Sequence, residues 1–179
     1  MATTLKFRTI VWRLLVPILL IAAPPVRRAD AQERPAPVAE FAAGALLFPD
    51  EGVMTEGFLG GTTRFYVTPR IGIGPEVAYV FGERHRHLML TANVTVDLIG
   101  PSGGEPPTVT PFVVVGGGLF RTSETFPLNE VFTSSEGAFT AGGGVRARVG
   151  KRIVAGAEAR IGWELHVRLS GFVGVRLGK

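Results

Sequence analysis

The chain has 179 residues, among them 24 glycines, 13 prolines and no cysteine, and 46% of its residues are hydrophobic. Without cysteine it has no disulfide framework, no thiolate zinc site and no cysteine nucleophile. A basic surface is the usual sign of nucleic-acid binding, but the basic excess lies before position 32, and beyond it 14 basic residues balance 14 acidic ones. We therefore expect no nucleic-acid partner.

Residues 1–31 have the three-part layout of a secretory signal peptide. A basic start precedes the apolar run 14–23, and the small residues 29–31 come before the expected cleavage site. An uncleaved anchor is the alternative, but this run is shorter than the roughly 20 residues that cross hydrocarbon. We expect export with cleavage, a short linker at 32–37 and one barrel domain at 38–179.

From residue 38 onward, hydrophobic and polar residues alternate with period two, which is typical of strands with two different faces. Eight segments are long enough to cross a bilayer as tilted strands, which takes about 9–11 residues. They are 38–48, 56–67, 71–81, 87–98, 109–120, 138–149, 153–163 and 165–178. The pattern is weak in the glycine-rich second segment. In the fifth, the run from Phe112 to Val115 leaves the parity open.

Charged residues inside these segments lie on the face opposite the aliphatic one. An arginine on the lipid face of a barrel costs about 2–4 kcal/mol at the bilayer midplane, so this exclusion predicts aliphatic residues facing lipid and charges facing the lumen. Eight strands enclose a space that side chains fill. We expect a neutralising luminal charge network of Glu40, Arg64, Glu76, Asp97, Arg146, Arg148, Glu158, Arg160, Arg168 and Arg176. Glu56 and Glu164, near the strand ends, bring this inward set to six acids and six arginines.

A hairpin pattern is repeated at residues 64–76 and 146–158. In each copy, a tight turn places an arginine directly opposite a glycine on the adjacent strand. A glutamate on that adjacent strand is then the diagonal neighbour of the arginine on the same face. We predict two inward ion pairs, each given room by a glycine: Arg64 with Glu76 beside Gly74, and Arg146 with Glu158 beside Gly156.

The connections between the strands differ at the two ends of the predicted barrel. Long outer loops and short periplasmic turns are typical of outer-membrane barrels. We expect outer loops at 49–55, 82–86 and 121–137, and opposite turns at 68–70, 99–108 and 150–152. An interfacial aromatic girdle is expected near the outer ends, formed by Tyr79, Phe81, Phe139 and Trp163.

The longest expected loop, 121–137, is apolar enough to contact an extracellular partner. Its apolar residues are Phe126, Pro127, Leu128, Val131 and Phe132. Packing of the same residues over the barrel mouth is an equally weighted alternative.

The sequence segments 67–76, 110–120 and 156–163 resemble the hairpins of the small eight-stranded outer-membrane β-barrel domain family. The resemblance covers about residues 38–178. The resemblance implies an all-β, antiparallel, up-and-down transmembrane barrel in the cell outer membrane. It also implies contact with a lipid bilayer whose outer leaflet is of the lipopolysaccharide type, and with the barrel-insertion machinery.

No catalytic, cofactor-binding or metal site is predicted. His166 and Ser170 share one face of the last strand, but four residues of strand span about 13 Å, too far for a hydrogen bond. Glu83, His85 and His87 lack a fourth ligand for zinc. We expect a non-enzymatic barrel, structural or presenting its outer loops. The alternatives are a soluble periplasmic lipocalin-like ligand carrier and a narrow pore.

Overall fold

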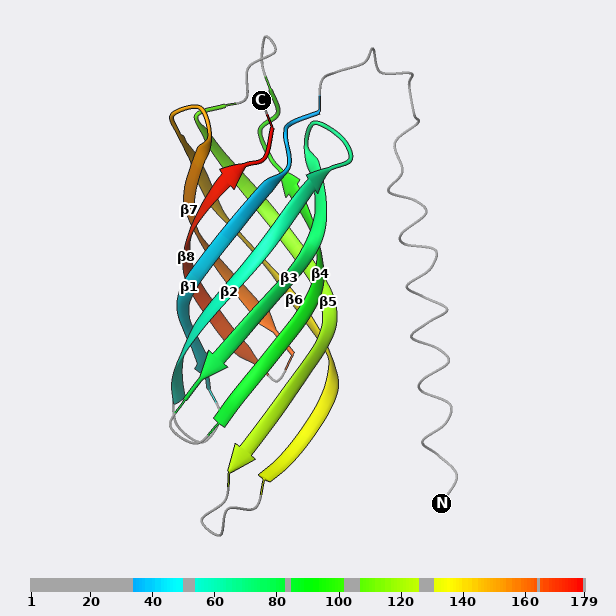
Figure 1. Ribbon diagram of the computed structural model, residues 1–179, viewed down its shortest axis with the longest axis vertical. Coiled ribbons are helices and arrows are strands. Elements are labelled where there is room, and N and C mark those ends of the chain that lie inside the picture. The colour runs from blue at the N-terminus through cyan, green and yellow to red at the C-terminus, as the bar shows by residue number, and fades with distance from the viewer. Residues whose placement is uncertain are drawn as a thin grey trace, which may run out of the picture. The chain divides into compact units, whose positions relative to one another are not determined.

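The computed structural model describes residues 34–49, 54–82, 85–101, 107–125, 131–163 and 165–178. They form β1 (Val38–Phe48), β2 (Met54–Tyr66), β3 (Ile71–Phe81), β4 (His85–Asp97), β5 (Val109–Thr125), β6 (Val131–Val149), β7 (Ile153–Gly162) and β8 (His166–Arg176). Each strand pairs antiparallel with the next, and β1 also pairs with β8, so the sheet closes into a barrel (Figure 1). This confirms the predicted fold class.

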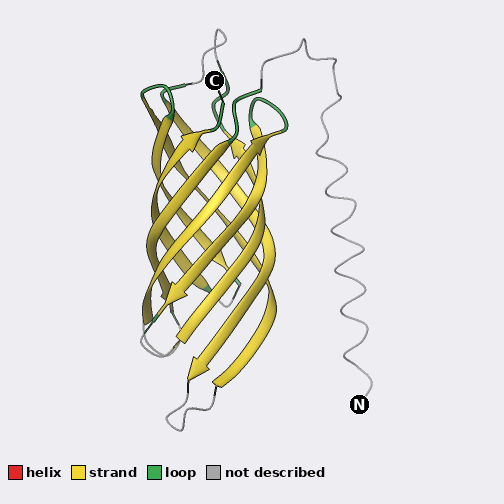
Figure 2. Ribbon diagram, viewed as in Figure 1, coloured by secondary structure: helices red, strands yellow, loops and turns green. Residues whose placement is uncertain are grey.

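Strands account for the whole barrel wall, as Figure 2 shows. Among the described residues, no helix is long and apolar enough to cross a membrane. The expected signal peptide at 1–31 lies outside the described residues.

Alternate side chains of each strand point into the lumen and away from it. In β4, Leu90 and Val94 are exposed, whereas Thr91 and Thr95 are buried. The structure also decides the parity of β5. Phe112 and Val114, each 2% exposed, face inward, and Val113 and Val115 face outward.

The outer face carries exposed large hydrophobic residues on all eight strands. The four expected girdle residues, Tyr79, Phe81, Phe139 and Trp163, are all among them. Among the described side chains of the strands, the exposed charges are Arg86, Arg121 and Glu136, near one end of the barrel. Between the two ends, the outer face is therefore an apolar belt.

The two ends of the barrel differ. One end carries the start of β1, the end of β8 and the connections 67–70, 98–108 and 150–152; we call it the turn end (Figure 1). Its first turn is closed by a 2.9 Å hydrogen bond from the Val67 amide to the Ile71 carbonyl. Its last turn needs glycine, because Gly150 has a φ of +70°.

The opposite end, which we call the hairpin end, differs from the prediction of a long loop at 121–137. β5 and β6 stay paired as far as Thr125 and Val131, so 121–125 and 131–137 are strand. The prediction was wrong because it ended each strand where aliphatic alternation stops. Beyond the apolar belt, β5 and β6 continue the ladder that they form in the barrel wall, and strand faces outside the hydrocarbon need no aliphatic side chains. Phe126, Pro127 and Leu128 lie outside the described residues.

The assignment of faces can be tested by placing an arginine on the belt. Val94 is exposed on β4, midway along the belt, and Val94→Arg is expected to lower the free energy of unfolding by about 2–4 kcal/mol in lipid vesicles. Ser135→Arg is the control, because Ser135 is exposed at the hairpin end opposite Arg121; its cost should stay within about 1 kcal/mol. Equal losses, measured by urea titration, would contradict the apolar belt.

Candidate functional site in the lumen

Eight of the ten predicted network residues form two groups inside the barrel. We call the first the central quartet: Glu76 of β3, Glu158 and Arg160 of β7, and Arg168 of β8. Arg160 contacts Glu76 at 2.8 Å and Glu158 at 2.9 Å. Arg168 contacts Glu158 at 2.8 Å and also pairs with Glu76. Two carboxylates and two guanidinium groups make the quartet neutral.

Neighbouring side chains satisfy more of the hydrogen-bonding capacity of the central quartet. The Asn93 Nδ2 donates to Glu76 at 2.6 Å, and the Ser170 hydroxyl donates to Glu158 at 3.4 Å. The guanidinium of Arg168 lies 5.1 Å from the ring centroid of Phe58, within the range of a cation–π contact. Such partners make the burial of charge tolerable.

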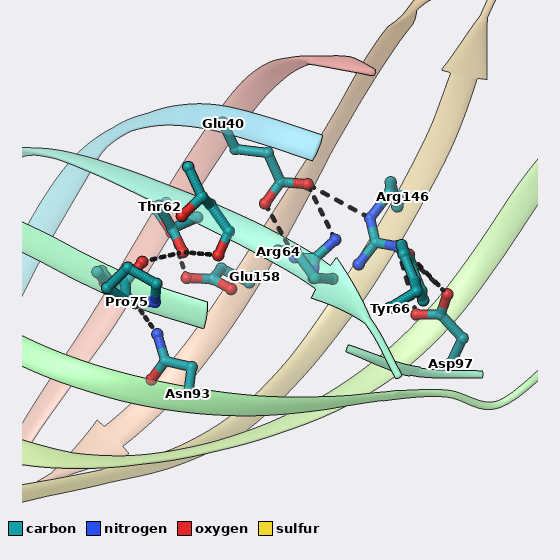
Figure 3. Close-up of polar contacts among 12 residues, drawn as sticks. Glu40, Thr62, Arg64, Tyr66, Pro75, Asn93, Asp97, Arg146 and Glu158 are labelled. Carbon is teal, nitrogen blue, oxygen red and sulfur yellow. Dashed lines mark hydrogen bonds and ion pairs between the residues drawn. The ribbon is translucent and has the colours of Figure 1, made fainter. Parts of the chain in front are cut away.

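The second group, the turn-side quartet, consists of Glu40 of β1, Arg64 of β2, Asp97 of β4 and Arg146 of β6. Arg64 donates to both oxygens of Glu40, at 3.0 and 2.9 Å (Figure 3). Arg146 bridges Glu40 at 3.6 Å and Asp97 at 3.3 Å. This quartet is neutral as well.

Tyr66 and Phe112 contact the arginines of the turn-side quartet. Arg146 donates to the Tyr66 hydroxyl at 2.8 Å, and this hydroxyl donates to Asp97 at 3.0 Å. Arg146 and Arg64 lie 4.8 and 5.8 Å from the centroid of the Phe112 ring. Neither Tyr66 nor Phe112 was predicted to belong to the network. Tyr66 shares the parity of Arg64, whereas the inward face of Phe112 was decided only by the structure.

The two predicted ion pairs are wrong in their partners, although the registers behind them are confirmed. The strand pairing places Thr62 opposite Glu76, and Arg146 opposite Gly156, as the tight turns predict. Arg64 nevertheless pairs with Glu40, on the strand at its other side.

Arg146 likewise reaches across the lumen to Asp97, and Glu158 pairs with Arg160 and Arg168. Inside a closed barrel of this width, a long side chain can reach several strands. A residue on the adjacent strand is therefore not favoured as an ion-pair partner over other residues within reach. The glycine roles change accordingly. Arg64 packs over Gly72 rather than Gly74, and Phe172 occupies the space beside Gly156.

Toward the hairpin end the lumen becomes apolar, a feature that the sequence reasoning missed. Leu46, Phe58, Val80, Met89 and Phe120 are each at most 4% exposed and pack as one cluster. For Leu46, Phe58, Val80 and Met89 the signal was present in the sequence, because these residues share the inward parity of the charged positions on the same strands. Phe120 lies on β5, whose parity the sequence leaves open. The predicted network included only charged residues and therefore omitted this cluster.

Aromatic rings and histidines lie beside this cluster. His87 stacks on Phe120 with ring centroids 4.9 Å apart, contacts Glu56 at 3.4 Å and lies 3.0 Å from the Thr122 hydroxyl. His166 is 1% exposed, and its Nδ1 lies 2.7 Å from the Trp163 carbonyl.

His87 thus faces the lumen, while Glu83, its candidate partner in a metal site, lies outside the described residues. Among the described residues, no group of three or more potential ligands is placed to hold a metal ion.

The last two predicted network residues, Arg148 and Arg176, belong to neither quartet. Both are half-buried at the turn end, where they line a cavity together with Arg146 and Asp97. The predicted balance of six acids and six arginines therefore does not hold locally. Glu56 pairs with His87 at the opposite end, and Glu164 lies outside the described residues.

Solved structures of known proteins share this architecture. The chain aligns with Neisserial surface protein A (NspA) over 79% of its length and 96% of that protein, with a TM-score of 0.65 and 15% sequence identity. The N-terminal barrel of Pseudomonas aeruginosa OprF gives a TM-score of 0.58 at 12% identity, over 77% of this chain and 96% of that one.

The attachment invasion locus protein Ail of Yersinia pestis gives a TM-score of 0.53 at 11% identity, over 78% of this chain and 95% of that one. These three are eight-stranded outer-membrane barrels. The chain has their fold. A structure of Ail with the heparin analogue sucrose octasulfate aligns with a TM-score of 0.53 and 12% identity, over 78% and 95% of the two chains. No family model and no curated protein matches the sequence.

The corrected pairing predicts where energetic coupling lies. In a double-mutant cycle, Arg64→Met and Glu40→Gln are expected to show a coupling free energy of about 1–3 kcal/mol, because the two side chains share two hydrogen bonds. Arg64→Met and Glu76→Gln should be additive to within about 0.5 kcal/mol. Urea titrations of the single and double variants in lipid vesicles measure both, and coupling to Glu76 instead of Glu40 would restore the pairing predicted from the ladder.

Proposed function

We propose that this chain is a non-enzymatic barrel of the bacterial outer membrane, with a lumen closed by its own side chains and with the β5–β6 hairpin presented outside. The observation that carries the proposal is the distribution of charge. The outer face is an apolar belt, and the two quartets hold their charges inside the barrel. A membrane barrel requires this arrangement, because hydrocarbon excludes ionised groups.

The soluble carrier considered as an alternative requires the reverse arrangement. A lipocalin-like protein encloses an aliphatic cavity for its ligand and turns polar residues to water. Here valines and leucines such as Val77, Leu90 and Val173 are 47–51% exposed, while Glu76 and Arg168 are buried at 6% and 2%. In water such a surface would be a large contiguous apolar patch, which is typical of aggregation.

The orientation follows from the two ends. Outer-membrane barrels place short turns in the periplasm and longer connections outside. We propose that the turn end, with its tight turns at 67–70 and 150–152, faces the periplasm. The hairpin end, where Phe132 is 57% exposed on the protruding β6, then faces outward.

Presentation of this hairpin to a partner agrees with the fold, since the structure of Ail with a heparin analogue shows one such barrel together with a ligand. The insertion machinery and a lipopolysaccharide-type outer leaflet remain the proposed partners during and after assembly.

Membrane fractionation tests the proposed location. The protein is expected to stay in the outer-membrane pellet after carbonate or high-salt washing, because its belt is held by hydrocarbon burial rather than by surface charge. Its folded form should also migrate differently from its heated form on a detergent gel. Release of the protein by carbonate would contradict membrane insertion and favour the soluble carrier.

Conductance separates a closed tube from a narrow pore. Three layers lie along the lumen, namely the turn-side quartet, the central quartet and the apolar cluster around Phe58 and Phe120. We expect no steady single-channel current from purified protein in a planar bilayer. Regular current steps that persist across preparations would replace the closed tube with the pore alternative.

A further inference from the structure

A small cavity opens into the lumen at the turn end, and its charge is unbalanced. Its volume is about 60 Å³, and its charged lining residues are Asp97, Arg146, Arg148 and Arg176. Asp97 is already engaged by Arg146 and Tyr66. Among the described residues, the guanidinium groups of Arg148 and Arg176 have no ion-pair or hydrogen-bond partner, so the described lining of the cavity has an excess of two positive charges.

The strand registers bring these arginines together from different parts of the sequence. Arg148 on β6 lies opposite Val154 on β7, and Arg176 on β8 lies opposite Val38 on β1. Val154 and Val38 are buried, at 5% and 4% exposure, and both line the cavity. The two arginines therefore line the cavity beside an apolar wall, and both remain partly exposed to solvent.

Arg146, two residues before Arg148 on β6, also lines the cavity. It is 6% exposed, and its Nη1 is used by Tyr66 and Asp97. Its Nη2 is buried and has no hydrogen-bond partner. Because this nitrogen is closed off from solvent, it belongs to the interior of the turn-side quartet, and the cations open to a ligand in the cavity are those of Arg148 and Arg176.

We propose that this cavity, which we call the turn-end vestibule, binds a phosphate group. Guanidinium forks match the geometry of phosphate oxygens, and a phosphate near charge −2 neutralises Arg148 and Arg176. A volume of about 60 Å³ corresponds to about four to six water-sized sites, close to the five heavy atoms of a phosphate. The Thr110 side chain, which also lines the vestibule, offers a hydroxyl.

The phosphate can come from a soluble anion or from a lipid headgroup, since the vestibule lies beside the edge of the apolar belt. The proposal does not depend on which way the barrel is oriented in the membrane. It goes beyond a structural role, because it assigns a small-molecule site to the lumen.

Calorimetric titration tests the site with two probes, at constant ionic strength, on the folded protein in non-ionic detergent. The first probe is inorganic phosphate, and the second is short-chain phosphatidic acid below its micelle concentration. We expect a dissociation constant of about 1 mM or tighter for at least one of them. Binding of phosphate indicates a soluble source, and binding of the lipid alone indicates a headgroup. Failure of both probes to bind overturns the proposal.

Paired variants locate the binding. Arg148→Gln with Arg176→Gln is expected to weaken binding about tenfold or more, because it removes both guanidinium partners of the phosphate. The control, Lys151→Gln with Arg152→Gln, removes the same charge from exposed positions at the same end outside the vestibule. It should change the affinity less than about twofold, since exposed charges are screened.

Equal weakening in both double variants would reduce the effect to general electrostatic attraction and overturn the vestibule as a site. Gel mobility of the unheated proteins shows that each variant is folded. Lost binding therefore cannot be confused with lost structure, and the result stands apart from the tests of location and conductance.

Discussion

The structure depends on one constraint, which is that an ionised group in a poorly hydrated tube must have a partner of opposite charge within reach. A buried ion pair gains little over an apolar pair, but a buried ion without its partner is strongly destabilising. The barrel meets this constraint locally. Each quartet combines two arginines with two carboxylates, and contacts of 2.8–3.6 Å hold them together. The same constraint excludes charge from the apolar belt.

From this constraint follows a lumen built in layers. Glycine, threonine and serine on the inward faces leave room for the long arginine side chains, which then link strands that are not neighbours in the sheet. Arg146 on β6 reaches Glu40 on β1 and Asp97 on β4. Such links brace the tube across its width, in addition to the backbone ladder around its circumference. Toward the hairpin end, an apolar cluster that includes Phe58 and Phe120 fills much of the lumen.

The two ends of the barrel have different chemical character. At the hairpin end, His87 and Glu56 lie among aromatic rings beneath a protruding hairpin. At the turn end, Arg148 and Arg176 have no such partner among the described residues, and both line a cavity. A middle filled by side chains thus separates two mouths of different chemical character.

The sequence alone predicts the faces of the clearly alternating strands and the register of the tight hairpins, because side chains alternate with period two and a short turn allows only one register. Val94 outward, Thr95 inward and Arg146 opposite Gly156 all follow from these two rules. The faces of β5 were decided by the structure. The extent of β5 and β6 was not predictable, since outside the apolar belt no alternation marks a strand. The partners of Arg64 and Arg146 were decided only by closure of the sheet, which places residues far apart in the chain within one side-chain length across the lumen.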